Sequence, residues 1–330
     1  NLTFTGGNAG EIDQNNINDK NGLGGAIFLY GNTSTLALEN VIVDSNTAYV
    51  AGGGIYTRGT NSNITIDKTQ FTNNTSPNGG AIYSDASNIS SIVVQNSLLS
   101  NNSSTSNGGA IYGNSTNTSK ILVQSSTFTN NTATGSGGAI YNKGLTNSTI
   151  SLENTTIFSN TAKLNGGGIY QYSNGNNTIH VVDSTIAGNK VLDNHGAGIC
   201  QDNGTQTLTL LNAIVYGNYK EISGLQEAKD IDFINAVGNA PTFNVAYSIY
   251  GASSHNISNN SIEAYQYQLN QLGEVFVLNN NQLELTDSNT LAIINTEQVA
   301  YKGTLIGKIG TDYYFYHQTN NQWQSFSIDT

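Results

Sequence analysis

Gly108-Gly109-Ala110-Ile111-Tyr112 recurs in six near-copies along this chain. The copies are Gly24-Gly25-Ala26-Ile27-Phe28, Gly52-Gly53-Gly54-Ile55-Tyr56, Gly79-Gly80-Ala81-Ile82-Tyr83, Gly137-Gly138-Ala139-Ile140-Tyr141, Gly166-Gly167-Gly168-Ile169-Tyr170 and the degraded Gly196-Ala197-Gly198-Ile199-Cys200. The isoleucines follow one another at steps of 28, 27, 29, 29, 29 and 30 residues. A fixed period of this size indicates an architecture of stacked repeats.

A second marker repeats in phase with the first, an apolar residue followed three positions later by asparagine. Its asparagines are Asn46, Asn74, Asn102, Asn131, Asn160, Asn189 and Asn218. Seven and five residues before each apolar marker stand two aliphatic residues, such as Ile121 and Val123 before Phe128. This period-two alternation, rich in β-branched residues, predicts strands with one face toward a core.

A repeat of about 29 residues leaves no room for crossover helices, so each repeat must coil back to the same register. We therefore expect an all-β, right-handed parallel β-helix, with equivalent side chains about 4.8 Å apart. The asparagine columns predict side-chain ladders, and the glycines predict turns with positive φ or close backbone approach. Residues 1–218 are interpreted as regular coils, the first 21 being an incomplete coil. Residues 219–330 are interpreted as irregular coils and a C-terminal cap of the same domain, with a separate β-domain as the alternative.

Composition narrows the classes of function. Charged residues make up 10% of the chain, and 22 acidic against 11 basic residues give a net charge of −11. This balance argues against binding to nucleic acid or anionic lipid. The sequence has no apolar run of 18 residues, so we expect no direct membrane insertion as a helix. The single cysteine, Cys200, excludes an internal disulfide framework. The missing methionine and the start at Asn1 suggest a fragment cut from a longer precursor.

The paired markers resemble the repeats of chlamydial polymorphic outer-membrane proteins and related pectin-lyase-like passenger domains. Gly79-Gly80-Ala81-Ile82 and Phe128-Thr129-Asn130-Asn131 match that pattern. The resemblance covers residues 24–218 well and 219–300 faintly. It implies a β-helix secreted by a bacterium or displayed on its surface, anchored to the outer membrane through a part not present here. It also implies an autotransporter-type adhesin that serves cell adhesion and virulence.

An aromatic row follows the repeated isoleucines. It consists of Phe28, Tyr56, Tyr83, Tyr112, Tyr141 and Tyr170, with Cys200 in the last place. If the isoleucines point inward, strand alternation puts these rings outside, where flat amphipathic surfaces suit contacts with glycans or proteins. The predicted binding residues are Tyr56, Tyr83, Tyr112, Tyr141 and Tyr170. A self-stacking ladder that stiffens the rod is the simpler interpretation, and an exposed ladder could also bind; an inward row is the alternative.

A second outward column stands four residues before each apolar marker. Its members are Glu39, Asp67, Gln95, Gln124, Glu153, Val182 and Leu211. The adjacent acids Glu39 and Asp67 would repel each other unless they are solvated or ion-bound. We expect a solvated face.

Two groups of polar residues raise the question of catalysis or metal binding. The first is His180, Asp183, Asp193, His195 and Asp202, which Glu153 could extend and which a polysaccharide hydrolase or lyase would need to bring together. Solvated turn residues are the simpler interpretation. The second is Asp13, Asn15, Asp19 and Asn21, which lack the spacing of a calcium loop and are better interpreted as a polar turn. Cys200 as a nucleophile would need His195 within reach, and a free thiol filling a gap is the simpler interpretation.

The sequence therefore favours a non-enzymatic adhesin passenger domain that needs no cofactor or metal. It would self-associate or attach to host or bacterial surface glycans and proteins through its lateral faces. A polysaccharide lyase or hydrolase of the pectin-lyase-like fold is the leading alternative, and a passive structural spacer is another.

Overall fold

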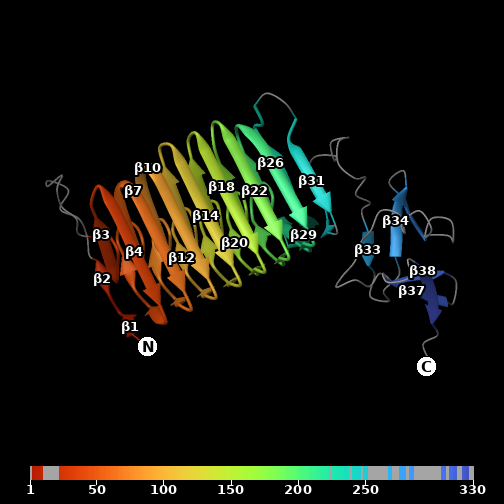
Figure 1. The fold of residues 1–330 in the computed structure, drawn as a ribbon, viewed down its shortest axis with the longest axis horizontal. Coiled ribbons are helices and arrows are strands. Elements are labelled where there is room, and N and C mark those ends of the chain that lie inside the picture. The colour runs from red at the N-terminus through yellow and green to blue at the C-terminus, as the bar shows by residue number, and fades with distance from the viewer. Residues whose placement is uncertain are drawn as a thin grey trace.

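The computed structural model describes residues 2–9, 22–222, 224–237, 240–246 and 248–251, together with six strands between residues 267 and 326. The main body is a parallel β-solenoid of about seven turns, with coils of about 29 residues (Figure 1). This confirms the predicted fold class. Among the described residues, no helix has the length and apolar character needed to cross a membrane.

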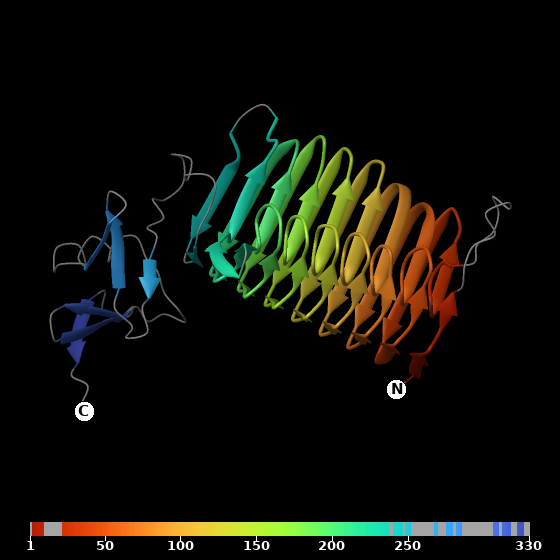
Figure 2. The ribbon, with the colours of Figure 1, turned by 180° about the vertical axis from the view of Figure 1, so that it is seen from behind.

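Three sheets run along the solenoid, and successive coils add one strand after another to each (Figures 1 and 2). The first sheet contains β1 (Leu2–Thr5), β5 (Val41–Asp44), β8 (Gln70–Thr72), β11 (Leu98–Ser100), β15 (Thr127–Thr129), β19 (Thr156–Phe158), β23 (Thr185–Ala187), β27 (Ile214–Tyr216) and β32 (Ile249–Tyr250). The second contains β2 (Asn8–Ala9), β6 (Thr47–Ala48), β9 (Thr75–Ser76), β12 (Ser103–Ser104), β16 (Thr132–Ala133), β20 (Thr161–Ala162), β24 (Lys190–Val191), β28 (Tyr219–Ile222) and β29 (Leu225–Ala228).

The third and largest sheet joins two sets of strands from each coil. One set is β3 (Ile27–Tyr30), β13 (Ile111–Ser115), β17 (Ile140–Gly144), β21 (Ile169–Tyr172), β25 (Ile199–Asp202) and β30 (Ile231–Ile234). The other is β4 (Thr33–Glu39), β14 (Thr118–Gln124), β18 (Asn147–Glu153), β22 (Asn176–Val182), β26 (Thr205–Leu211) and β31 (Thr242–Ala246). The long strands β7 (Ile55–Asp67) and β10 (Ile82–Gln95) take part in both sets and connect them. The place where the two sets meet is called the junction below.

The strand register confirms the predicted columns. Ile82, Ile111 and Ile140 are direct partners in adjacent coils, so each repeat lies on the previous one. The aliphatic columns point into one apolar core, in which Val123 and Phe128 are fully buried. The stacked coils therefore bury a continuous interior that no single repeat could enclose alone.

The glycine pairs meet both predicted requirements. The first glycine of every repeated stretch has a left-handed backbone, with φ between 52° and 71°. The second lies against the next coil, where a Cβ on Gly109 would come within 2.0 Å of the carbonyl oxygen of Gly138. Ala197 occupies this place in the last copy, because the chain facing it there is Lys229 rather than another glycine pair.

The marker asparagines form the predicted ladder inside the rod. Asn131 Oδ1 accepts hydrogen bonds from both the backbone N–H and Nδ2 of Asn102, each at 3.0 Å. Its own Nδ2 donates to Asn160 Oδ1 at 2.9 Å. The same pattern runs from Asn46 to Asn218 with every side chain buried. It ends on the buried carboxylate of Asp230, whose Oδ1 accepts two hydrogen bonds from Asn218 at 2.8 Å.

The two ends of the solenoid differ from the regular coils. β1 and β2 pair with β5 and β6 and form the predicted incomplete first coil. Asp13, Asn15, Asp19 and Asn21 lie outside the described residues. At the other end, β30, β31 and β32 extend the coils in parallel, while β28 and β29 form an antiparallel hairpin.

Six further strands form two antiparallel sheets. One contains β33 (Tyr267–Leu269), β34 (Val275–Asn279) and β35 (Gln282–Leu285), and the other contains β36 (Ile306–Ile309), β37 (Asp312–His317) and β38 (Gln322–Phe326). The division of the chain into 1–218 and 219–330, with a cap in the second part, stays a prediction.

Candidate functional site

The aromatic row lies outside the apolar core, as strand alternation predicts, but its rings are not the exposed surface that the sequence suggested. Tyr56, Tyr112 and Tyr170 are only 4%, 8% and 6% exposed, and Tyr83 and Tyr141 are half-buried. The expectation of open rings is therefore wrong. The physical reason is that each ring is covered by its neighbours in the coils before and after it.

Ring contacts run unbroken along the row. Centroid separations lie between 4.4 Å, for Tyr112 and Tyr141, and 5.5 Å, for Phe28 and Tyr56. Burial raises the pKa of the phenol group in all five tyrosines of the row, because an ionised phenolate would lose its hydration there. The row is thus a self-stacking ladder, and the part of its five tyrosines in binding stays a prediction.

Another outward column, different from the one that contains Glu39 and Asp67, lies two residues beyond the aromatic row on the same strands. This polar column consists of Tyr30, Arg58, Asp85, Asn114, Lys143, Tyr172 and Asp202, which are register partners in successive coils. Tyr30 is 60% exposed, and the side chain of Arg58 is 58% exposed. The exposed side chains of this face are therefore Tyr30 and Arg58 of the polar column, whose other members are half-buried.

Asp85 connects the polar column to the aromatic row. Its carboxylate accepts a hydrogen bond from the Tyr56 hydroxyl at 3.2 Å and another from Asn114 Nδ2 at 2.9 Å. It also forms an ion pair with Nε of Arg58 at 3.6 Å. Three neighbouring side chains are thus positioned by one carboxylate. Asp202 repeats this role near the other end, where it accepts from the Tyr170 hydroxyl and from Asn235 Nδ2.

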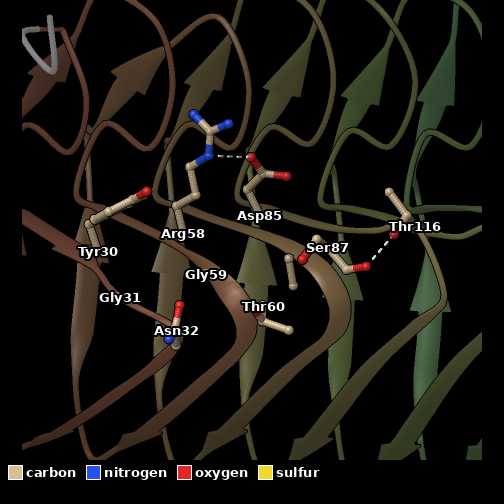
Figure 3. Close-up of a pocket in the computed structure, with 10 residues that line it drawn as sticks. Tyr30, Gly31, Asn32, Arg58, Gly59, Thr60, Asp85, Ser87 and Thr116 are labelled. Carbon is tan, nitrogen blue, oxygen red and sulfur yellow. Dashed lines mark hydrogen bonds and ion pairs between the residues drawn. The ribbon is translucent and has the colours of Figure 1, made fainter. Parts of the chain in front are cut away.

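A pocket of about 360 Å³ opens beside Asp85, where the polar column meets the junction. It spans four coils (Figure 3), and its lining is Tyr30, Gly31, Asn32, Arg58, Gly59, Thr60, Asp85, Ala86, Ser87 and Thr116. Thr116 closes one end by donating a hydrogen bond from its hydroxyl to the carbonyl oxygen of Ser87. The pocket therefore combines an aromatic ring, an ion pair, an amide and hydroxyls.

No direct signal of this pocket is present in the sequence. The polar column changes residue type at every coil, so it leaves no repeating pattern. The available clue was that Gly31 and Gly59 follow Tyr30 and Arg58 at equivalent positions, just past the aromatic row.

On the second predicted face, one lysine lies close to both of the adjacent acids. Lys68 Nζ lies 3.4 Å from carboxylate oxygens of both Glu39 and Asp67, which relieves the repulsion expected between these acids. Further along, Gln95 Nε2 donates to Gln124 Oε1 at 2.6 Å, and Gln124 Nε2 donates to Glu153 Oε2 at 2.7 Å. This face is a solvent-facing hydrogen-bonded ladder.

The residues considered for catalysis take separate partners. His195 Nδ1 lies 3.5 Å from Asp232, Asp202 binds Tyr170, and Asp183 accepts from Asn212 Nδ2 at 2.6 Å. His180 is exposed on β22, as predicted. In the described part of the chain, no three His, Cys, Asp or Glu side chains are grouped so that they could hold a metal ion.

Cys200 is a free, fully buried thiol at the end of the aromatic row. Burial raises its pKa, because the thiolate would be desolvated. The partner that His195 Nδ1 faces is Asp232, at 3.5 Å, and the imidazole is exposed whereas the thiol is fully buried. The thiol fills a gap, as the simpler interpretation had it.

Comparison with known proteins identifies the type of repeat. A family model of the Chlamydia polymorphic membrane protein repeat matches residues 68–85, 96–114 and 125–143. These three segments are similar to the Chlamydia polymorphic membrane protein repeat. Each matched segment holds both markers, the asparagine motif and the glycine pair, so the resemblance seen in the sequence is confirmed. Searches among curated proteins and among solved structures found no match. Chlamydia polymorphic membrane protein repeats in a parallel β-solenoid fit a surface passenger domain of the autotransporter type.

Proposed function

We propose that this chain is the passenger part of a bacterial adhesin, displayed on the cell surface or secreted, and that it acts by contact rather than by catalysis. The single observation that carries the proposal is the match of three consecutive repeats to the Chlamydia polymorphic membrane protein repeat, within a parallel β-solenoid. The partner is a glycan or protein of a host or bacterial surface, or a second copy of the rod.

The polar column is the contact surface in this proposal. Its support is that exposed Tyr30 and Arg58 stand in line with Lys143 and Tyr172, so that one partner can touch several coils at once. Tyrosine and arginine are enriched where proteins bind their partners. The five tyrosines of the aromatic row stack beside the polar column and stiffen this face. Tyr83 and Tyr141 are half-buried, so a partner can also reach part of their rings.

The experiment that tests adhesion uses the purified chain coupled to fluorescent beads and incubated with cultured epithelial cells. We expect the beads to attach. Attachment should survive Asp183→Asn and His195→Ala, which change the residues considered for catalysis. It should fall when Tyr30→Ala and Arg58→Gln are combined, because both change the exposed polar column.

A parallel assay measures release of reducing ends or unsaturated sugars from a panel of polysaccharides. Turnover that disappears in Asp183→Asn or His195→Ala would show an enzyme and refute the proposal. Beads that fail to attach to cells, from a rod that also stays monomeric in sedimentation, would favour a passive spacer instead.

A further inference from the structure

The pocket beside Asp85 is a local depression in the surface of the rod, lined by residues of four coils. We propose that it binds a neutral sugar residue, a hexose or N-acetylhexosamine, of a larger glycan. The proposal rests on the adhesive function proposed above and gives that function a ligand class and a location. Four features of the pocket carry it: its shape, an exposed ring, a balanced ion pair and a rim of amides and hydroxyls.

The shape of the pocket is fixed by the backbone. Its volume of about 360 Å³ is near the lower end of ligand pockets, a size suited to one or two sugar rings. Gly59 and Gly31 line it side by side, and a Cβ on Gly59 would come within 2.1 Å of the carbonyl oxygen of Gly31. Glycine at position 59 therefore allows the two coils to approach this closely at the pocket. The coil of Tyr30 is the edge of the third sheet, where β3 and β4 pair only with β7, and the other coils of the pocket lie between neighbours on both sides.

Tyr30 supplies the apolar surface at one end. Its side chain is among the most exposed aromatic groups of the described residues, and its ring lies 6.4 Å from that of Phe28, the first member of the aromatic row. A rigid ring with a polar tip suits the C–H face of a pyranose, which is apolar on one side and hydroxyl-rich at its edge. An exposed ring beside a polar pocket is the usual arrangement for such a contact.

The ion pair between Arg58 and Asp85 supplies donors and acceptors next to one another. Arg58 engages Asp85 through Nε, and its two terminal nitrogens point away from the carboxylate (Figure 3). Guanidinium N–H groups can donate to one sugar hydroxyl while a carboxylate oxygen accepts from the adjacent one. Hydrogen bonds to charged groups are the stronger kind, so this pair would provide most of the orientation.

Charge selects a neutral ligand over an acidic one. Arg58 is the only arginine of the chain, and Asp85 balances its charge within the pocket. A carboxylated or sulfated sugar would face Asp85 at short range and a chain with a net charge of −11 at longer range. The remaining polar groups, from Asn32, Thr60 and Ser87, are uncharged and suit hydroxyl or acetamido groups.

The test measures binding by calorimetry and saturation-transfer NMR. The neutral probes are lactose, N-acetyllactosamine, maltose and cellobiose, and the acidic probes are sialyllactose and a heparin disaccharide. We expect at least one neutral probe to bind in preference to the acidic ones. Tyr30→Ala and Arg58→Gln should each weaken this binding by about tenfold, the loss of a stacking contact or of a charged hydrogen bond. Ser87→Trp fills the pocket from an exposed position and should abolish binding.

The matched control is Tyr49→Ala. Tyr49 is an exposed tyrosine, 48% accessible, that belongs neither to the polar column nor to the lining of the pocket. Removing its ring should leave sugar binding unchanged. Thermal unfolding of every variant checks that the rod is intact, and Thr60→Trp is a second blocking variant should Ser87→Trp fail to fold.

Binding of no neutral probe, binding that Tyr30→Ala and both blocking variants leave unchanged, or a preference for acidic probes would overturn the assignment. The cell assay separates this failure from failure of adhesion. Beads that attach to cells regardless of Ser87→Trp would refute the pocket but leave adhesion standing. A pocket that binds sugar on a rod that does not attach to cells would support the ligand class and refute adhesion.

Discussion

At the scale of single residues, adding one methyl group at the second glycine of a pair should push two adjacent coils apart. The second glycine of each pair lies so close to the next coil that Gly109→Ala would place Cβ 2.0 Å from a backbone oxygen, which cannot rotate away. We expect a loss of about 3 kcal/mol in the free energy of unfolding, measured by denaturant titration. The control is Gly217→Ala, where φ is +72° but nothing lies within 4 Å of the added Cβ. That change should cost about 1 kcal/mol, the cost of a left-handed alanine. Equal losses would contradict the steric explanation.

The tyrosines of the aromatic row predict a pH dependence. Their pKa is raised in the folded rod, by burial above all, whereas an unfolded chain releases phenol protons near pH 10. The unfolded state therefore binds fewer protons above about pH 10, and the free energy of unfolding falls as pH rises beyond that value. The stabilisation is fully present below it.

Phenolate absorbance during an alkaline titration measures this effect. The five tyrosines of the row should ionise only as the rod unfolds, and so should Tyr250, whose pKa burial raises to about 12. A single titration of all tyrosines, complete before circular dichroism changes, would contradict the buried ladder.

At the scale of structural elements, the asparagine ladder ties each coil to the next through the interior. Asn131→Leu would keep the branched shape of the side chain but leave the backbone N–H and Nδ2 of Asn102 and the carbonyl oxygen of Leu99 without this partner. Unpaired buried polar groups cost about 1–3 kcal/mol each, so we expect a loss of at least about 4 kcal/mol, or failure to fold. The control is Asn176→Ala, whose hydrogen bond to Asn147 Oδ1 is exposed. It should change stability by less than about 0.5 kcal/mol. Similar losses in both variants would argue against a structural role for the ladder.

The same scale shows what the sequence could predict and what it could not. Every repeating column was predictable, because the places of Ile111, Phe128 and Asn131 have the same environment in every coil. The first keeps isoleucine, the second an apolar residue and the third asparagine. The exposed fraction of the aromatic side chains was not predictable, because it depends on how the rings of successive coils pack on one another. Period-two alternation specifies only on which side of the strand a side chain lies. The pocket was not predictable either, since Tyr30 and Arg58 are register partners that share no chemistry.

At the scale of the whole molecule, a rod whose coils contact only their neighbours should tolerate the loss of one complete coil. Deleting residues 140–168 joins Ala139 to Ile169 and recreates the sequence Gly-Gly-Ala-Ile-Tyr where the two parts of the chain are joined. Ile111 would then pair with Ile169, and Asn131 would donate to Asn189 in place of Asn160. We expect a folded rod shortened by about 4.8 Å, seen in solution scattering, with one cooperative thermal transition.

Since the pocket lies in coils before the deletion, its sugar binding should be unchanged. Deleting only residues 140–153 puts every later column out of register and should abolish folding. A shortened rod that unfolds, or a half-coil deletion that folds as well as the full one, would contradict a solenoid held together by column-on-column stacking.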